Sequence, residues 1–259
     1  MSPTLYQWLQ ALPVLLGAAA VTWLVSIPLR NVTLADVLWP VLFVLAAFTY
    51  ALHEPRLEPR AVLTLVLVTL WGLRLALYLA ARTLGHEEDR RYSALRRRHE
   101  PGFAWKSLVL VFASQAVLAW IISLPLLGAT TGITRPLGWL DWTATALWAT
   151  GFYFETIGDW QLSRFKANPA NAGQVMDRGL WRYTRHPNYF GDFCVWWGLY
   201  LVALANGAWW SIVGPAVMSY LLLRVSGVTL LERHIGKRRP GYAEYVRRTS
   251  TFFPRRPRP

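Results

Sequence analysis

Seven apolar segments, each close to the length needed to cross a bilayer, constrain this chain more than any other feature. They occupy residues 8–29, 33–52, 61–81, 104–127, 138–160, 190–206 and 209–231. A helix needs about 20 mainly apolar residues to span a hydrocarbon core of roughly 30 Å, because it rises only about 1.5 Å per residue. The chain is 54% hydrophobic with 15 tryptophans, which is too apolar for an ordinary soluble domain. The sequence therefore predicts an all-α, polytopic integral membrane protein with seven transmembrane helices.

The basic residues alternate from one connection between segments to the next. Arg and Lys are dense in residues 82–106 and 163–189 and in the tail 233–259, and they are sparse in the connections between these. By the positive-inside rule, this pattern predicts an external N-terminus and a cytoplasmic C-terminus. The first segment has no preceding basic region and no clear cleavage site, so we interpret it as a retained helix. We expect residues 1–259 to form one membrane domain.

Charge and cysteine content argue against several other classes of protein. The net charge of +13 follows the alternation of the loops, and no helix-turn-helix or zinc-finger pattern accompanies it, so we expect no nucleic-acid partner. Cys194 is the only cysteine, and the five histidines lack HExxH or HxxxH spacing, so we expect no disulfide and no metal site. The chain also lacks GxGxxG and GxxxxGK[ST] motifs. Any nucleotide would therefore bind to cytoplasmic loops and helix ends.

Ionisable and amide side chains gather at the cytoplasmic ends of the last three segments. Residues four apart share a helix face, which applies to Glu155 with Asp159 and to Asn188 with Asp192. Such groups in a membrane usually face an interior cavity and pair with each other or with a ligand. Two interpretations stay open: a structural ion network, or a polar pocket for a phosphate-bearing ligand, which the Arg-rich loops favour. The full set is Glu155, Asp159, Lys166, Asn188, Asp192, Arg224 and Glu232.

A second group of polar residues lies in the second and third segments. His53 and Glu54 close the second segment, and Tyr78 lies in the third between Arg74 and Arg82. A Glu at a helix end is commonly an interfacial residue, and a Tyr within a span commonly packs against a neighbour. The residues alone leave both the structural and the functional role open.

Several longer stretches resemble one known family. They are "FETIGDWQLSRFK", "NPANAGQVMDRGLWRYTRHPNYFGD", "WWGLYL" and "LLERHIGKRRPGYAEYVRRTSTFFP", and together they resemble the steroid 5-alpha-reductase (3-oxo-5-alpha-steroid 4-dehydrogenase) family. The stretch "HEEDRRY" resembles more narrowly its bacterial, DUF1295-like branch. The resemblance covers about residues 50–254 and is strongest in the last hundred.

This resemblance implies an activity and its partners. It implies a seven-helix reductase of the bacterial inner membrane that uses NADPH to reduce the C=C bond of a 3-oxo-Δ4 steroid or a related enone lipid. The expected partners are this substrate and membrane lipid, with no obligate protein partner. The residues it implies for cofactor binding are Arg91, Tyr92, Asp159, Lys166, Tyr183, Arg185, Asn188, Asp192, Trp196, Arg224, Tyr245 and Arg247, with Arg248 as an alternative to Arg247.

The resemblance also implies a catalytic pair, Glu54 and Tyr78. Hydride delivery to the β-carbon of an enone places negative charge on the ketone oxygen, and two donors at that oxygen would stabilise it. Glu54 must be protonated to donate, which burial favours because desolvation disfavours the charged form. His53 stands where mammalian members have Gln.

A methyltransferase is the strongest alternative to the reductase. The stretches "RHPNYFG" and "YAEYVRRTSTFFP" also resemble isoprenylcysteine- or phospholipid-type membrane methyltransferases, which use S-adenosylmethionine. Those enzymes carry paired glutamates in the last segment, where this chain has only Glu232, and the "ETIGDWQLSRFK" and "EEDRRY" stretches favour the reductase. A seven-span receptor is disfavoured because it would not need acids and amides at the cytoplasmic ends of three helices. A transporter is disfavoured because no broken-helix repeat is present.

Overall fold

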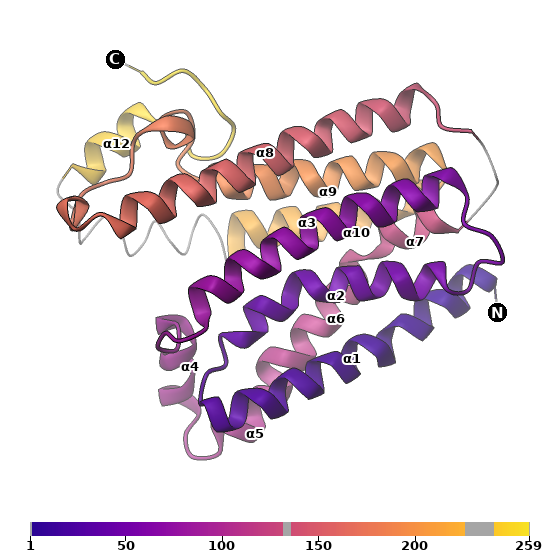
Figure 1. Cartoon of the computed structure of the whole chain (residues 1–259), viewed down its shortest axis with the longest axis horizontal. Helices are drawn as coiled ribbons and strands as arrows, with labels where there is room; N and C mark the ends of the chain where they lie inside the picture. The colour runs from indigo at the N-terminus through magenta and orange to yellow at the C-terminus, as the bar shows by residue number, and fades with distance from the viewer. Residues whose placement is uncertain (1, 132–135, 226–240, 259) are drawn as a thin grey trace. The chain divides into compact units, whose positions relative to one another are not determined.

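The structure is a computed structural model that describes residues 2–131, 136–225 and 241–258, and this part of the chain is all-α (Figure 1). The first half contains α1 (Pro3–Leu29), α2 (Leu34–Ala51), α3 (Pro59–Thr83), α4 (Arg90–His99), α5 (Phe103–Ser107), η1 (Leu108–Ala113), α6 (Ser114–Ile122) and α7 (Leu124–Thr130). The second half contains α8 (Trp139–Ala167), η2 (Pro169–Asn171), η3 (Gly179–Arg182), α9 (Pro187–Ala205), η4 (Trp209–Ile212), α10 (Val213–Tyr220), η5 (Leu221–Val225) and α12 (Tyr242–Arg248).

Four of the described helical stretches are long and apolar enough to cross a membrane. They are Thr4–Leu29, Leu34–Ala51, Pro59–Thr83 and Phe103–Ile122. These stretches confirm the first three predicted segments, most of the fourth, and an integral membrane protein. Helices α8 and α9 and the shorter apolar stretch Trp209–Val225 occupy the other three segments but do not meet the same test of length and hydropathy. Residues 226–231 of the seventh predicted segment lie outside the described residues.

The fourth predicted segment is interrupted near its end. Helix α6 ends at Ile122, and α7 begins after Ser123 with Pro125 in its first turn. Proline fits a first turn, where no N–H is needed, and it disrupts a helix interior. The Ser123 hydroxyl bonds to the Trp120 carbonyl oxygen at 2.8 Å and to the Tyr50 hydroxyl at 2.6 Å. The break between α6 and α7 therefore lies at Ser123 and Pro125, and the Ser123 hydroxyl bonds it to Tyr50 of α2.

The chain divides into two compact units. Unit 1 comprises Met1–Asp141 and Val202–Gly214, and unit 2 comprises Trp142–Leu201 and Pro215–Pro259. In unit 1, α2 packs along α1 and α3. Its largest wholly buried side chains include Phe43, Tyr50, Trp71 and Phe112.

A buried ion pair closes one end of unit 1. The Arg60 guanidinium donates to both carboxylate oxygens of Asp141 at 2.8 Å, and the two side chains are only 5% and 1% exposed. Arg60 also donates to Asn206 Oδ1 at 3.2 Å. The Asn206 amide in turn donates to the carbonyl oxygens of Gly128 and Thr131. This network joins the starts of α3 and α8 to the end of α7, and sequence reasoning missed it.

In unit 2, α8 and α9 pack with their backbones in close approach (Figure 1). A Cβ atom on Gly151 or Gly191 would collide with backbone of the facing helix, and one on Gly198 would lie 2.9 Å from the Ala144 carbonyl oxygen. Only glycine allows this approach without displacement. The packing sets Gly191 against Glu155, and Gly158 against the first turn of α9.

Candidate functional site

Oxygen-bearing side chains of α8 and α9 gather at one level of their packed pair. Asp159 is 4% exposed, and its Oδ1 accepts a hydrogen bond from the Asn188 side-chain amide at 3.1 Å. Glu155 is 3% exposed and lies one turn before Asp159, beside Gly191. Asp192 is half-buried one turn after Asn188. We call Glu155, Asp159, Asn188 and Asp192 the acceptor cluster.

The acceptor cluster is suited to ligands that carry hydroxyl or amide N–H groups. Carboxylate and amide oxygens accept hydrogen bonds, and buried carboxylates in a membrane protein require partners. The contact between Asp159 and Asn188 places these two predicted residues together. Their role in binding a cofactor stays a prediction.

The other predicted residues near this cluster differ in accessibility. Lys166 is exposed near the end of α8, and Tyr183 is 43% exposed in the loop that follows. Arg224 is exposed in η5. Trp196 is wholly buried on α9. These three side chains are thus exposed to solvent, whereas Trp196 contributes to packing.

Arg185 fastens the C-terminal segment to the start of α9. It is 7% exposed, and its guanidinium donates to the carbonyl oxygen of Thr249 at 2.8 Å and to Thr251 Oγ1 at 2.8 Å. Its backbone N–H donates to the Ser250 carbonyl oxygen at 2.9 Å. The hydroxyl of the neighbouring Thr184 donates to the Phe252 carbonyl oxygen at 2.7 Å. These contacts give the "RYTRHP" stretch a structural role that sequence reasoning missed. They leave Arg185 little capacity to bind a cofactor.

The predicted residues of α12 also make contacts within unit 2. Tyr245 is 4% exposed, and its hydroxyl donates to the Trp181 carbonyl oxygen at 2.6 Å. Arg247 forms an ion pair with Glu244, and Arg248 lies 3.3 Å from the same carboxylate. Tyr245 therefore anchors α12, while both arginines stay accessible at the surface.

Arg91 and Tyr92, which belong to unit 1, bind a residue that sequence reasoning missed. The Tyr92 hydroxyl donates to Asp36 Oδ1 at 2.6 Å, and Arg91 Nη2 donates to Asp36 Oδ2 at 2.8 Å. Arg91 Nε also donates to Asp89 at 3.0 Å. These bonds hold α4 to the first turn of α2. An acidic residue within an apolar segment was the signal that could have identified Asp36.

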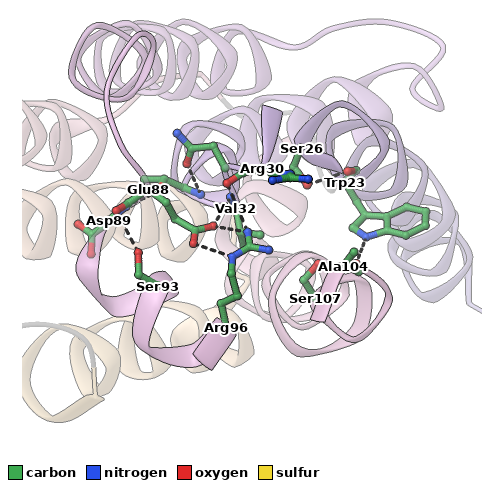
Figure 2. A network of polar contacts seen from close by, with 12 residues as sticks. Trp23, Ser26, Arg30, Val32, Glu88, Asp89, Ser93, Arg96, Ala104 and Ser107 are labelled. Carbon is green, nitrogen blue, oxygen red and sulfur yellow. Dashed lines mark hydrogen bonds and ion pairs between the residues drawn. The ribbon is translucent and has the colours of Figure 1, made fainter. Parts of the chain in front are cut away.

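The rest of the "EEDRRY" stretch is bonded to the connection between α1 and α2 (Figure 2). The Glu88 carboxylate accepts from the Val32 N–H at 2.9 Å and from Arg96 at 2.7 and 3.0 Å. The Asp89 N–H donates to the Thr33 hydroxyl at 2.9 Å. The "EEDRRY" stretch therefore links residues 82–106 to the start of α2 through hydrogen bonds.

The contribution of the Asp89 carboxylate to stability depends on pH. Burial alone would raise the pKa of Asp89, but hydrogen bonds from the Arg91 side chain and N–H, with attraction from Arg91 and Arg82, hold that pKa below its usual value. The contribution of Asp89 to stability is thus complete above about pH 4, the ordinary carboxyl pKa. It is lost as the pH falls through the lower pKa of the folded state.

We expect Asp89→Asn to lower the free energy of unfolding at pH 7 by at most about 1 kcal/mol, because the partly exposed pair is screened. Asn retains the helix cap. The variant should also lose less stability than the wild type as the pH falls below about 4. Thermal melts of detergent-solubilised protein across this pH range measure both effects. Glu87→Gln, which changes an exposed neighbouring acid, should keep the wild-type profile; identical profiles for Asp89→Asn and wild type would refute the assignment.

The structure does not bring the predicted catalytic residues together. Glu54 follows α2 and accepts a hydrogen bond from the buried Gln7 side chain at 2.9 Å. Helices α2 and α3 run in opposite directions, and Gly72 of α3 packs against Pro40 and thus against the first half of α2 (Figure 1). Tyr78 is the twentieth residue of α3, which places it about 28 Å along the helix from the end next to Glu54. One ketone oxygen cannot contact both side chains.

The fold and this site define the class: an all-α integral membrane protein with an acceptor cluster between two closely packed helices. Among the described residues, no group of three or more His, Cys, Asp or Glu side chains could hold a metal ion. Residues 22–249 match the model of a family described as a protein of unknown function, DUF1295. The chain belongs to the DUF1295 family.

Two further comparisons complete the picture. The uncharacterized protein C594.04c of Schizosaccharomyces pombe is 27% identical over 266 residues, which cover 91% of this chain and 76% of that protein. No solved structure matches the chain significantly.

Proposed function

We propose that this protein is a membrane reductase that uses NADPH to reduce the C=C bond of an enone lipid, such as a 3-oxo-Δ4 steroid. The observation that carries the proposal is the buried contact between Asp159 and Asn188 in the acceptor cluster. Both residues match the positions at which the steroid 5-alpha-reductase family binds its cofactor. The chain belongs to the DUF1295 family. This membership supports the proposal, because the "HEEDRRY" stretch resembles the DUF1295-like branch of the steroid 5-alpha-reductase family.

The residues of unit 2 fit a nicotinamide nucleotide in part. Asp159, Asn188 and Asp192 would accept hydrogen bonds from its hydroxyl and amide groups. The exposed Lys166 and Tyr183 would bind its phosphates. Other exposed candidates are Arg224 and Arg247, whereas the bonded Arg185 and Tyr245 maintain the fold around the site. NADPH would supply the hydride when bound.

Tyr78 remains the proposed donor to the ketone oxygen of the substrate. A phenol O–H donates one hydrogen bond, and such a donor stabilises negative charge that develops on the oxygen. Glu54 is left out of the proposed chemistry, because it lies at the opposite end of α3. We assign Glu54 instead to the contact that joins α1 to the end of α2.

The proposal includes seven membrane spans in the bacterial inner membrane, with the N-terminus outside and the C-terminus in the cytoplasm. Helices α8 and α9, together with the stretch Trp209–Val225, would supply the last three spans. The basic residues of α4 and of the loop after α8 support a cytoplasmic position for both connections. Glu155 and Asp159 on α8 and Asp192 on α9 lower the hydropathy of these helices.

Isotope transfer tests the proposed reaction. NADPH deuterated at C4 of the nicotinamide, on each face in turn, is incubated with purified protein and a 3-oxo-Δ4 steroid. We expect deuterium at the β-carbon of the saturated product with one of the two labels, and roughly 100-fold slower turnover for Tyr78→Phe. Unlabelled product, or wild-type turnover by Tyr78→Phe, would contradict the reaction or the assignment of Tyr78.

The membrane methyltransferase remains the rival function. The "RHPNYFG" stretch does not separate the two classes, because its Arg185 holds the C-terminal segment, a role that either class could require. Glu232, on which the sequence comparison of the two classes partly depends, lies outside the described residues. Methyl transfer from S-adenosylmethionine to a lipid acceptor would favour the rival.

A further inference from the structure

A cavity of about 370 Å³ lies at the C-terminal end of α8, within unit 2. Its volume falls in the range of roughly 300–1,000 Å³ that is usual for small-molecule sites. Its walls are the last two turns of α8 and the loop that follows. The lining residues are Trp160, Gln161, Arg164, Phe165, Asn168, Asn171, Met176, Arg178 and Gly179.

Side-chain amides hold the loop wall of this cavity against α8. The Gln161 carbonyl oxygen accepts from the Leu180 N–H at 2.9 Å. Gly179 has a φ of 59°, and a Cβ there would collide with the Gln161 amide, so this position requires glycine. At the other end of the loop, the Asn171 amide donates to the Phe165 carbonyl oxygen at 2.9 Å. Contacts within the protein therefore define the walls of the cavity.

The described residues that line this cavity carry only positive charge. Arg164 and Arg178 are among them, and none of these described residues is acidic. Among the described residues, neither guanidinium has a carboxylate partner. Arg164 lies over the ring of Trp160, 5.6 Å from its centroid, which orients the guanidinium. Two guanidinium groups without acidic partners, beside neutral amides, are suited to bind a phosphate.

The cavity is separate from the acceptor cluster. Asp159 and Arg164 are five positions apart on α8, which places them about 140° apart around the helix axis. Trp160, on the cavity side, is 54% exposed. Tryptophan is enriched where membrane meets water, and basic pockets at the cytoplasmic ends of membrane helices bind lipid headgroups.

We propose that this cavity is a phosphate-binding site in which Arg164 and Arg178 together hold one phosphate group. The phosphate belongs either to the headgroup of an anionic phospholipid or to a soluble phosphate. The site is independent of the proposed reductase function, because it uses a different face of α8 and none of the acceptor cluster.

Binding of two probes to full-length protein in neutral detergent tests this site. Retention of phosphatidylglycerol relative to phosphatidylcholine is measured by native mass spectrometry, and inorganic phosphate is titrated by thermal shift. We expect Arg164→Gln/Arg178→Gln to weaken binding of one probe roughly 100-fold, since each charge-assisted hydrogen bond contributes about a factor of ten or more. Arg97→Gln/Arg98→Gln, which removes the same charge from exposed positions of α4, should bind as the wild type does.

The pattern of losses decides between the sources. A loss confined to phosphatidylglycerol assigns the site to lipid, and a loss in the phosphate titration assigns it to a soluble ligand. Arg164→Lys/Arg178→Lys keeps the charge but not the bidentate geometry, so it should bind with intermediate affinity. This intermediate binding would show that the loss in the Gln variant does not come from misfolding. Equal behaviour of the cavity pair and the α4 pair in both assays would overturn the proposal.

Discussion

Arg60→Met is expected to cost about 3–5 kcal/mol in the free energy of unfolding, because it leaves a buried carboxylate without its partner. Asp141 is 1% exposed on its side chain and receives two hydrogen bonds from Arg60. Asp141 also accepts a hydrogen bond from the Gly138 N–H at 2.8 Å, but a neutral N–H does not neutralise the charge of the carboxylate. The substitution also removes the donor to Asn206. Thermal melts after detergent extraction measure the loss.

Two further variants separate this effect from a general loss of positive charge. Arg56→Met changes an exposed arginine near the start of the same helix and should melt as the wild type does. Arg60→Met/Asp141→Leu should regain much of the lost stability, because a buried ion pair can often be replaced by apolar side chains of similar volume. If Arg60→Met melted at the same temperature as Arg56→Met, the ion pair between Arg60 and Asp141 would not stabilise the fold.

The membrane helices of unit 1 were predictable because each is a continuous apolar run of sufficient length. Helix α4 was not predictable in this way, because none of its side chains is buried and six of its ten residues are Arg or His. It is held by the Asp89 cap and by bonds to Asp36. Asp36 lies more than fifty positions from its partners Arg91 and Tyr92, so no local pattern indicates these bonds. The same reason explains why the pairing of Arg60 with Asp141 was missed.

The acceptor cluster was predictable in part, because a spacing of four residues places side chains on one helix face. The close approach that joins Asp159 to Asn188 depends on Gly151, Gly158 and Gly191, whose role emerges only when both helices are seen together. The separation of Glu54 from Tyr78 could not be predicted from the resemblance. An alignment relates positions in two chains but does not give the distance between the ends of a helix.

Asp159→Ala is expected to weaken NADPH binding roughly 100-fold, because it removes a buried acceptor and leaves the Asn188 amide without this partner. Asp159 is 4% exposed, so water cannot readily take its place. Asp177→Ala removes an exposed acid from the loop of the same unit and is the matched control. Binding is measured by titration of purified protein, with melting temperature recorded for each variant to confirm the fold.

A paired titration of the purified protein tests whether a nicotinamide nucleotide binds through the acceptor cluster. NADPH and S-adenosylmethionine are titrated separately into wild type and Asp159→Ala. We expect saturable binding of NADPH to the wild type, loss of this binding in Asp159→Ala, and no binding of S-adenosylmethionine. Saturable binding of S-adenosylmethionine without binding of NADPH would contradict it.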